Sequence, residues 1–165
     1  MSNDRKVTVL VDSREQKPLL FPKIMVAGGR GRQIVTETVK LGAGDYMLKS
    51  YLHDGPCVIV ERKASISEIF NNMLDPKDSR RQKRAFDKLV TACDYPILII
   101  EGSVGSLSRV TKYAPDPALA LDALLRETMV RGIHLWFVGE CGMPAKRRMV
   151  GELIVRAMLA WQERL

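Results

Sequence analysis

The chain has 165 residues, 46% hydrophobic and 27% charged, a composition that indicates one soluble globular domain with a full core. No apolar run is long enough to span a membrane, and the polar first residues exclude a signal peptide. The formal net charge of +7 favours a polyanionic partner such as nucleic acid, although many basic proteins bind none.

Short apolar runs rich in β-branched residues predict strands at residues 7–11, 34–41, 46–49, 58–63, 96–100 and 133–138. Apolar residues at helical spacing predict helices at residues 66–74 and 79–93, a third helix that starts at 117 and is ended by Gly132, and a fourth from 144 to near residue 165. The segment 75–78 is expected to separate the first two helices, and Asp116 with Pro117 to begin the third.

Two connections are candidate ligand-binding loops. The segment 27–32 combines glycines with Arg30 and Arg32, which predicts a mobile loop. Closure on a DNA backbone and a solvated hairpin connection are equally good interpretations of it. The polar segment 103–115 is a candidate substrate-side loop, because long loops in compact domains are often functional.

The charged end of the predicted strand 58–63 points to chemistry. Residues two apart on a strand project to the same side, so Glu61 and Lys63 lie together and Arg62 faces away. A hairpin-like pairing would bring Asp45 beside Glu61. Two adjacent carboxylates repel each other unless a divalent cation lies between them, and Mg²⁺ prefers oxygen ligands. A neighbouring lysine can orient or deprotonate water, or stabilise charge on phosphorus, so the pattern indicates a metal-dependent phosphodiesterase.

Three motifs in this order carry a family resemblance. Asp-Ser-Arg-Glu at 12–15, Gly-Asp-Tyr at 44–46 and Glu-Arg-Lys at 61–63 resemble the nuclease domain of the XPF/Mus81 structure-specific endonucleases. The segment 95–102 resembles a later strand of that domain, which belongs to the PD-(D/E)XK superfamily. The resemblance is clear over 7–102 and implies a restriction-endonuclease-like α/β fold, with a central mixed β-sheet flanked by helices.

The resemblance also implies roles for individual residues. Asp45 and Glu61 would bind Mg²⁺ or Mn²⁺, and Asp12 would complete the acidic cluster directly or through water. Lys63 would position or activate the nucleophile, within a supporting ionic shell formed by Arg14, Glu15 and Arg62. Taken without the resemblance, Asp12 is instead a turn-capping residue.

The chain departs from the family pattern at one position. Members of the family commonly carry an acid four residues after the lysine, where this chain has Ser67, and Glu68 follows. Either the connection holds one extra residue or Glu68 is an ordinary surface acid. We assign Glu68 no metal role.

Basic residues also gather at the start of the predicted helix 79–93. Cations are disfavoured near a helix N-terminus, which favours a phosphate-contacting surface over a merely solvated face. The candidate DNA-binding residues are therefore Arg30, Arg32, Arg80, Arg81, Lys83 and Arg84.

The function that these features predict is a metal-dependent DNA endonuclease acting on branched or otherwise structured DNA, as in repair and recombination. We expect a single domain over 1–165 without a helix-hairpin-helix module, and a homodimer or a partner protein chain. Three cysteines without a CxxC pair predict reduced thiols, in a bacterial or phage-infected cytoplasm or in a nucleus. The alternative functions are a catalytically silent DNA-binding scaffold subunit and, with no cofactor motif to support it, a small-molecule enzyme.

Overall fold

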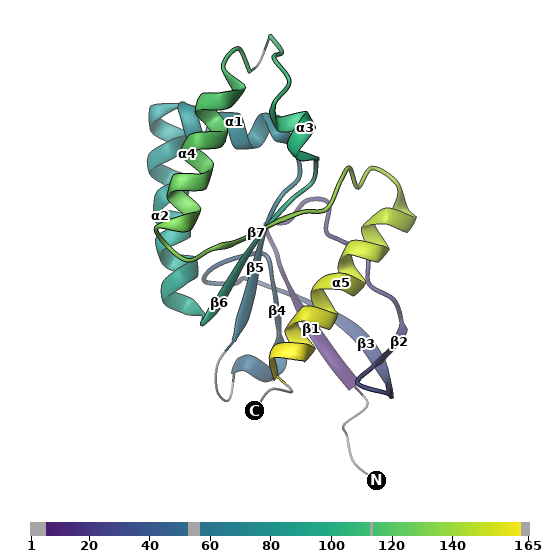
Figure 1. Ribbon diagram of the computed structural model, residues 1–165. Helices are drawn as coiled ribbons and strands as arrows, with labels where there is room; N and C mark the ends of the chain where they lie inside the picture. Colours follow the sequence, from purple (N-terminus) through teal and green to yellow (C-terminus); the bar gives the residue numbers. More distant parts are fainter. Residues whose placement is uncertain (1–5, 53–56, 113, 163–165) are drawn as a thin grey trace.

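Seven strands form one mixed sheet in the order β2-β3-β1-β4-β5-β6-β7 (Figure 1). The computed structural model describes residues 6–52, 57–112 and 114–162. Only β2 and β4 run antiparallel to the other strands. The strands are β1 Lys6–Asp12, β2 Ile24–Ala27, β3 Arg30–Val39, β4 Tyr46–Leu48, β5 Val58–Lys63, β6 Tyr95–Ile100 and β7 His134–Phe137.

Helices cover both faces of this sheet, which confirms the predicted fold class. Helices α1, α2 and α4 pack together on one side, and α5 crosses the other (Figure 1). No helix in the described residues is both long and apolar enough to cross a bilayer. The helices are η1 Lys49–Leu52, α1 Ile66–Leu74, α2 Pro76–Ala92, α3 Val104–Leu107, α4 Pro117–Met129 and α5 Pro144–Gln162.

The centre of the sheet follows from its apolar runs. Strand β6 is buried from Pro96 through Ile100, and the first half of β5, from Val58 to Val60, is buried as well. Continuous burial is typical of parallel strands covered on both faces, because successive side chains meet helices on opposite sides. The charged residues that follow these runs are thereby carried to one edge of the sheet.

Two predicted boundaries were wrong. Helix α2 begins at Pro76 instead of residue 79, because the Asp75 carboxylate accepts hydrogen bonds from the backbone N–H groups of Lys77 and Asp78, both at 2.9 Å. Asp75 also ends α1, since its own N–H donates to Asn71. The polar connection 103–115 likewise contains a short helix, α3.

The expected mobile loop at 27–32 is a tight hairpin turn between β2 and β3. Gly28 and Gly29 have φ values of 56° and 71°, as a type I′ turn requires. Arg30 and Arg32 therefore belong to β3, which starts earlier than residue 34. The interpretation as a hairpin connection is the one that the structure supports.

Strand β4 pairs with β5 so that Tyr46 lies opposite Val60. The backbone N–H of Asp45 donates to the carbonyl of Val60 at 2.8 Å, which sets Asp45 beside Glu61. Gly44 makes this approach possible, because its φ is +66° and a Cβ there would overlap Ile59 Cγ2.

Replacing Gly44 with alanine should therefore destabilise the fold by about 2 to 4 kcal/mol, from the left-handed backbone and the overlap together. Urea denaturation measures this loss. Gly42→Ala is the matched control, because Gly42 lies two residues away, in open space, and should change stability by less than about 0.5 kcal/mol. Equal losses in the two variants would contradict the steric argument.

Candidate active site

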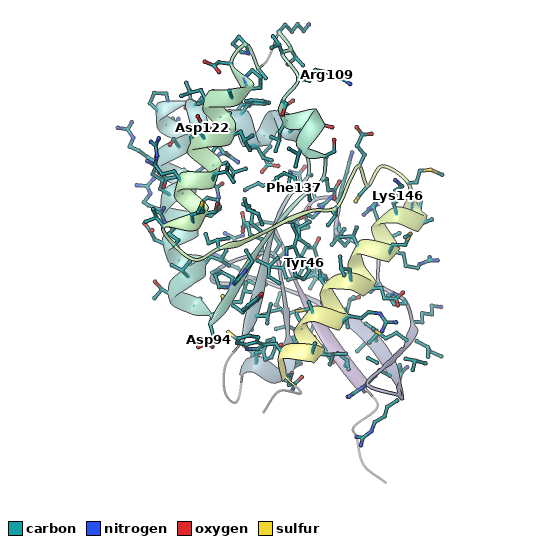
Figure 2. The ribbon with its side chains drawn as sticks, in the orientation of Figure 1. Tyr46, Asp94, Arg109, Asp122, Phe137 and Lys146 are labelled. Atoms are coloured by element: carbon teal, nitrogen blue, oxygen red, sulfur yellow. The ribbon has the colours of Figure 1, made fainter. Side chains whose placement is uncertain are left out.

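A cavity of about 650 Å³ lies at the edge of the sheet where β1, β5 and β6 end. Residues that follow these strands line it, together with residues from α1 and the beginning of α5. Figure 2 shows Lys146 at this end of α5, and Tyr46 deeper, in the body of the sheet. The lining residues are Arg14, Glu15, Gln16, Lys17, Asp45, Glu61, Arg62, Lys63, Ala64, Glu68, Glu101, Cys141, Gly142 and Arg147.

The structure brings Asp45, Glu61 and Lys63 together in this cavity. Lys63 Nζ donates to Glu61 Oε1 at 2.9 Å, as expected for side chains on the same side of a strand. The Asp45 carboxylate accepts the backbone N–H of Arg62 through Oδ2 at 2.7 Å. Its Oδ1 accepts no hydrogen bond from the described residues. The two carboxylates therefore share one small volume with a single ammonium group.

Electrostatics reflect this crowding. Burial, and then the charge of Glu61, raise the pKa of Asp45 to about 7, while the hydrogen bond from Arg62 opposes the rise. Burial alone would lower the pKa of Lys63, but the charges of Glu61 and Glu68 outweigh it and raise that pKa. Lys63 is consequently a charged ammonium group across the physiological pH range.

Asp12 is buried beneath the cavity and does not line it. Its Oδ1 accepts from the backbone N–H and Nε of Arg14, and its Oδ2 accepts from Nη2 of Arg14 and the N–H of Leu41. Burial raises the pKa of Asp12, but these hydrogen bonds outweigh it and hold that pKa below its usual value. Asp12 is thus the anchor of a turn, and Arg14 is its partner.

Arg62 also lines the cavity, but its guanidinium contacts other acids than Glu61 and joins the ends of three strands. Its guanidinium contacts Glu101 at 2.5 Å and Glu15 at 3.1 Å, and it donates to the carbonyl of Lys17 at 3.0 Å. The Arg62 side chain is only 4% exposed, so these acids neutralise a buried cation. This network is the supporting ionic shell, and it includes Glu101.

Sequence reasoning missed the role of Glu101, although a signal existed. Glu101 directly follows the buried strand β6, just as Glu61 directly follows the buried first half of β5. Cys141 and Arg147 were missed as well, and no local pattern identifies them. They reach the cavity only because the chain returns across it after β7.

Glu68 is not an ordinary surface acid. Its Oε1 lies 3.3 Å from Lys63 Nζ, and its Oε2 accepts the N–H of Ala64 at 3.3 Å. The hydroxyl of Ser65 caps α1 by accepting the N–H of Glu68, which orients the first turn of this helix toward the cavity.

The donor set fits Mg²⁺ better than a metal that demands a closed protein cage. No group of three or more metal-ligating His, Cys, Asp or Glu side chains occurs in the described part of the chain. Mg²⁺ commonly binds through one or two carboxylates and keeps several waters. Asp45 and Glu61 are two carboxylates that line the cavity, which is the number that such a site uses.

The six candidate DNA-binding residues do not line the cavity. Arg30 and Arg32 lie at the start of β3, the end of the sheet opposite to the cavity. On α2, Arg81 pairs with Asp78 at 3.2 Å and Lys83 with Glu127 at 2.9 Å. Arg80 and Arg84 are exposed on the same helix.

Comparisons with known proteins support the fold. No protein-family model and no curated protein sequence matches the chain. Similar solved structures include XPF from Aeropyrum pernix, with a TM-score of 0.60 and 18% identity, and the same protein in complex with DNA, with 0.59 and 17%. They cover 94% and 96% of this chain, which spans only 61% and 66% of theirs. The chain therefore has an XPF-like, restriction-endonuclease-like fold.

The pKa of Asp45 generates a prediction about stability. Folding raises this pKa from 3.8 to about 7, so the stability that the protonated carboxyl supplies is complete below about pH 4 and lost as the pH rises to 7. Without divalent ions, Asp45→Asn should be more stable than the wild type at about pH 8 by on the order of 1 to 2 kcal/mol.

Urea denaturation at several pH values tests this expectation. The gain should shrink as the pH falls to about 4, because the wild-type carboxyl is then protonated. Asp122→Asn on α4 is the control, since Asp122 is exposed and distant from the cavity (Figure 2). A gain for Asp45→Asn that is independent of pH would show that it does not arise from the charge.

Proposed function

We propose that this chain hydrolyses phosphodiester bonds in DNA with the help of Mg²⁺ or Mn²⁺. The observation that carries the proposal is the cavity in which Asp45, Glu61 and Lys63 meet at the ends of neighbouring strands. Crowded carboxylates with a charged lysine are costly to a fold unless they serve a ligand. A divalent cation neutralises the carboxylates, and the negative charge of a phosphodiester neutralises the lysine.

Asp45 and Glu61 are the proposed metal ligands. Each presents a carboxylate to the cavity, whereas both oxygens of Asp12 are occupied by Arg14 and Leu41. We therefore place Asp12 outside the metal site. When bound, the metal supplies a Lewis acid for the phosphoryl oxygen and for the attacking water.

Lys63 contributes a positive charge. Because its pKa is raised, its ammonium orients water or stabilises negative charge on phosphorus, and does not act as a base. Arg62, Glu15 and Glu101 keep the strand ends together, so that Glu61 and Lys63 remain on the cavity side. These three are positioning residues.

DNA is the proposed substrate for two reasons. The net charge of +7 suits a polyanion, and a protein with the same fold has been seen in complex with DNA. The exposed arginines of α2 and β3 would serve as secondary contacts, because they lie outside the cavity. A catalytically silent scaffold would need none of the carboxylate pair and lysine that meet here.

Cleavage of labelled branched, single-stranded and duplex DNA tests this function. We expect cuts that need Mg²⁺ or Mn²⁺ and that EDTA abolishes. Asp45→Asn and Lys63→Met should each lower the cleavage rate by about 100-fold or more, because each removes a charge from the reacting centre. DNA binding in EDTA should survive in both variants.

Asp122→Asn and Lys88→Met are the matched controls, because both residues are exposed and lie outside the cavity. They should cut at the wild-type rate. DNA binding without metal-dependent cutting would instead identify a silent scaffold subunit.

A second copy of the chain is the proposed protein partner. A groove of about 550 Å³ lies between α5 and the edge strand β7. It exposes Met149 and Leu153, which are 69% and 44% accessible.

Leu153→Glu should convert a dimer into a monomer. Light scattering after size exclusion measures this change in mass. Leu119→Glu, an exposed leucine on α4, should leave the mass unchanged. A monomeric wild type at high concentration would refute this interface.

A further inference from the structure

Arg147 is a cation at the cavity that has no role in the chemistry proposed above. Arg14 is paired with Asp12, Arg62 with Glu101 and Glu15, and Lys63 with Glu61 and Glu68. Arg147, near the beginning of α5, also lines the cavity but contacts no carboxylate in the described part of the chain.

The guanidinium of Arg147 is incompletely satisfied. Its Nη2 donates to the carbonyl of Pro18, which is a neutral acceptor. Its Nε is buried and has no hydrogen-bond partner among the described residues. A partly buried cation with an unused donor is unfavourable unless an anion completes it, and a planar guanidinium suits a phosphate or a carboxylate.

The position of Arg147 is set by close packing of α5 against the segment 18–20. Gly151, one helical turn further along, permits this packing, because a Cβ at Gly151 would overlap the carbonyl oxygen of Leu20. The same segment is tied to the catalytic strand, since Arg62 donates to the carbonyl of Lys17. Arg147 is therefore held at the cavity by backbone contacts.

Arg147 also lies within electrostatic reach of the ionic shell. Cys141 is buried and lines the same cavity, and its pKa is raised by burial and by Glu101 but lowered by Arg62, Lys146 and Arg147. The α5 side of the cavity is thus positively charged, whereas the strand side carries Asp45 and Glu61. A bound anion finds its counter-charge on the α5 side.

We propose that Arg147 binds a phosphate of the DNA strand that enters the cavity. This inference rests on the proposed function and adds a second contact to it. Lys63 and the carboxylate pair act on the phosphate being cleaved. Arg147 holds a neighbouring phosphate from the α5 side, with a two-pronged hydrogen bond that fixes the strand along the cavity.

The salt dependence of DNA binding tests this contact without requiring cleavage. Fluorescein-labelled duplex and branched DNA are titrated with the full chain in EDTA, between about 50 and about 200 mM KCl. Arg147→Ala should weaken binding about tenfold and reduce the slope of log K against log salt by about 0.9, the contribution of one phosphate contact. Arg147→Lys keeps the charge but loses the two parallel donors of the guanidinium. It should therefore keep the slope and weaken binding less than Arg147→Ala does.

Arg148→Ala is the matched control. Arg148 is the next residue of α5 but lines a different groove, beside Thr36 and Thr38 of β3, and its replacement should leave the slope unchanged. Thermal melting checks that every variant is folded. An unchanged slope in Arg147→Ala, or an equal loss in Arg148→Ala, overturns the role of Arg147 while the proposed function stands. A wild type that binds no DNA overturns both.

Discussion

The register between β4 and β5 is the constraint on which the candidate site depends. Tyr46 lies opposite Val60, and the N–H of Asp45 donates to the Val60 carbonyl at 2.8 Å. A slip of one residue would turn Asp45 to the other face of the sheet, away from Glu61. Gly44 protects this register, since its backbone passes too close to Ile59 for any side chain. The carboxylates of Asp45 and Glu61 lie together because the hydrogen-bonded pair β4 and β5 fixes their positions.

Around that pair, each buried charge has a defined partner. Arg62 is neutralised by Glu101 and Glu15, and Asp12 by Arg14, so the strand ends are tied to one another by ion pairs. Asp45 is the exception, because its pKa is raised to about 7 by burial and by Glu61. A buried carboxylate that the fold does not neutralise is a feature of candidate functional sites, and it costs stability. In the function that we propose, a cation binds on the strand side of the cavity and an anion binds beside α5.

Sequence patterns predicted secondary structure best where a pattern is compatible with a single kind of element. The apolar runs before Glu61 and Glu101 were predicted as buried strands, and both are. Prediction was wrong where local chemistry had two outcomes. Asp75 and Pro76 were predicted to break the helix. Asp75 is in fact both the C-cap of α1, through its backbone N–H, and the N-cap of α2, through its side chain. The glycines at 28 and 29 form a tight turn, because adjacent positive φ values match the twist of a hairpin.

By itself, the sequence predicted most of the strands and helices and the shared side of Glu61 and Lys63, and its family resemblance implied the mixed α/β fold class. The positions of the elements and the shared side follow from the two-residue period of a strand and from runs of apolar residues. Only the tertiary structure decided that Asp12 is committed to Arg14, that Glu101 pairs with Arg62, and that Arg147 reaches the cavity. Those contacts join residues from different elements, and local periodicity carries no information about which elements become neighbours.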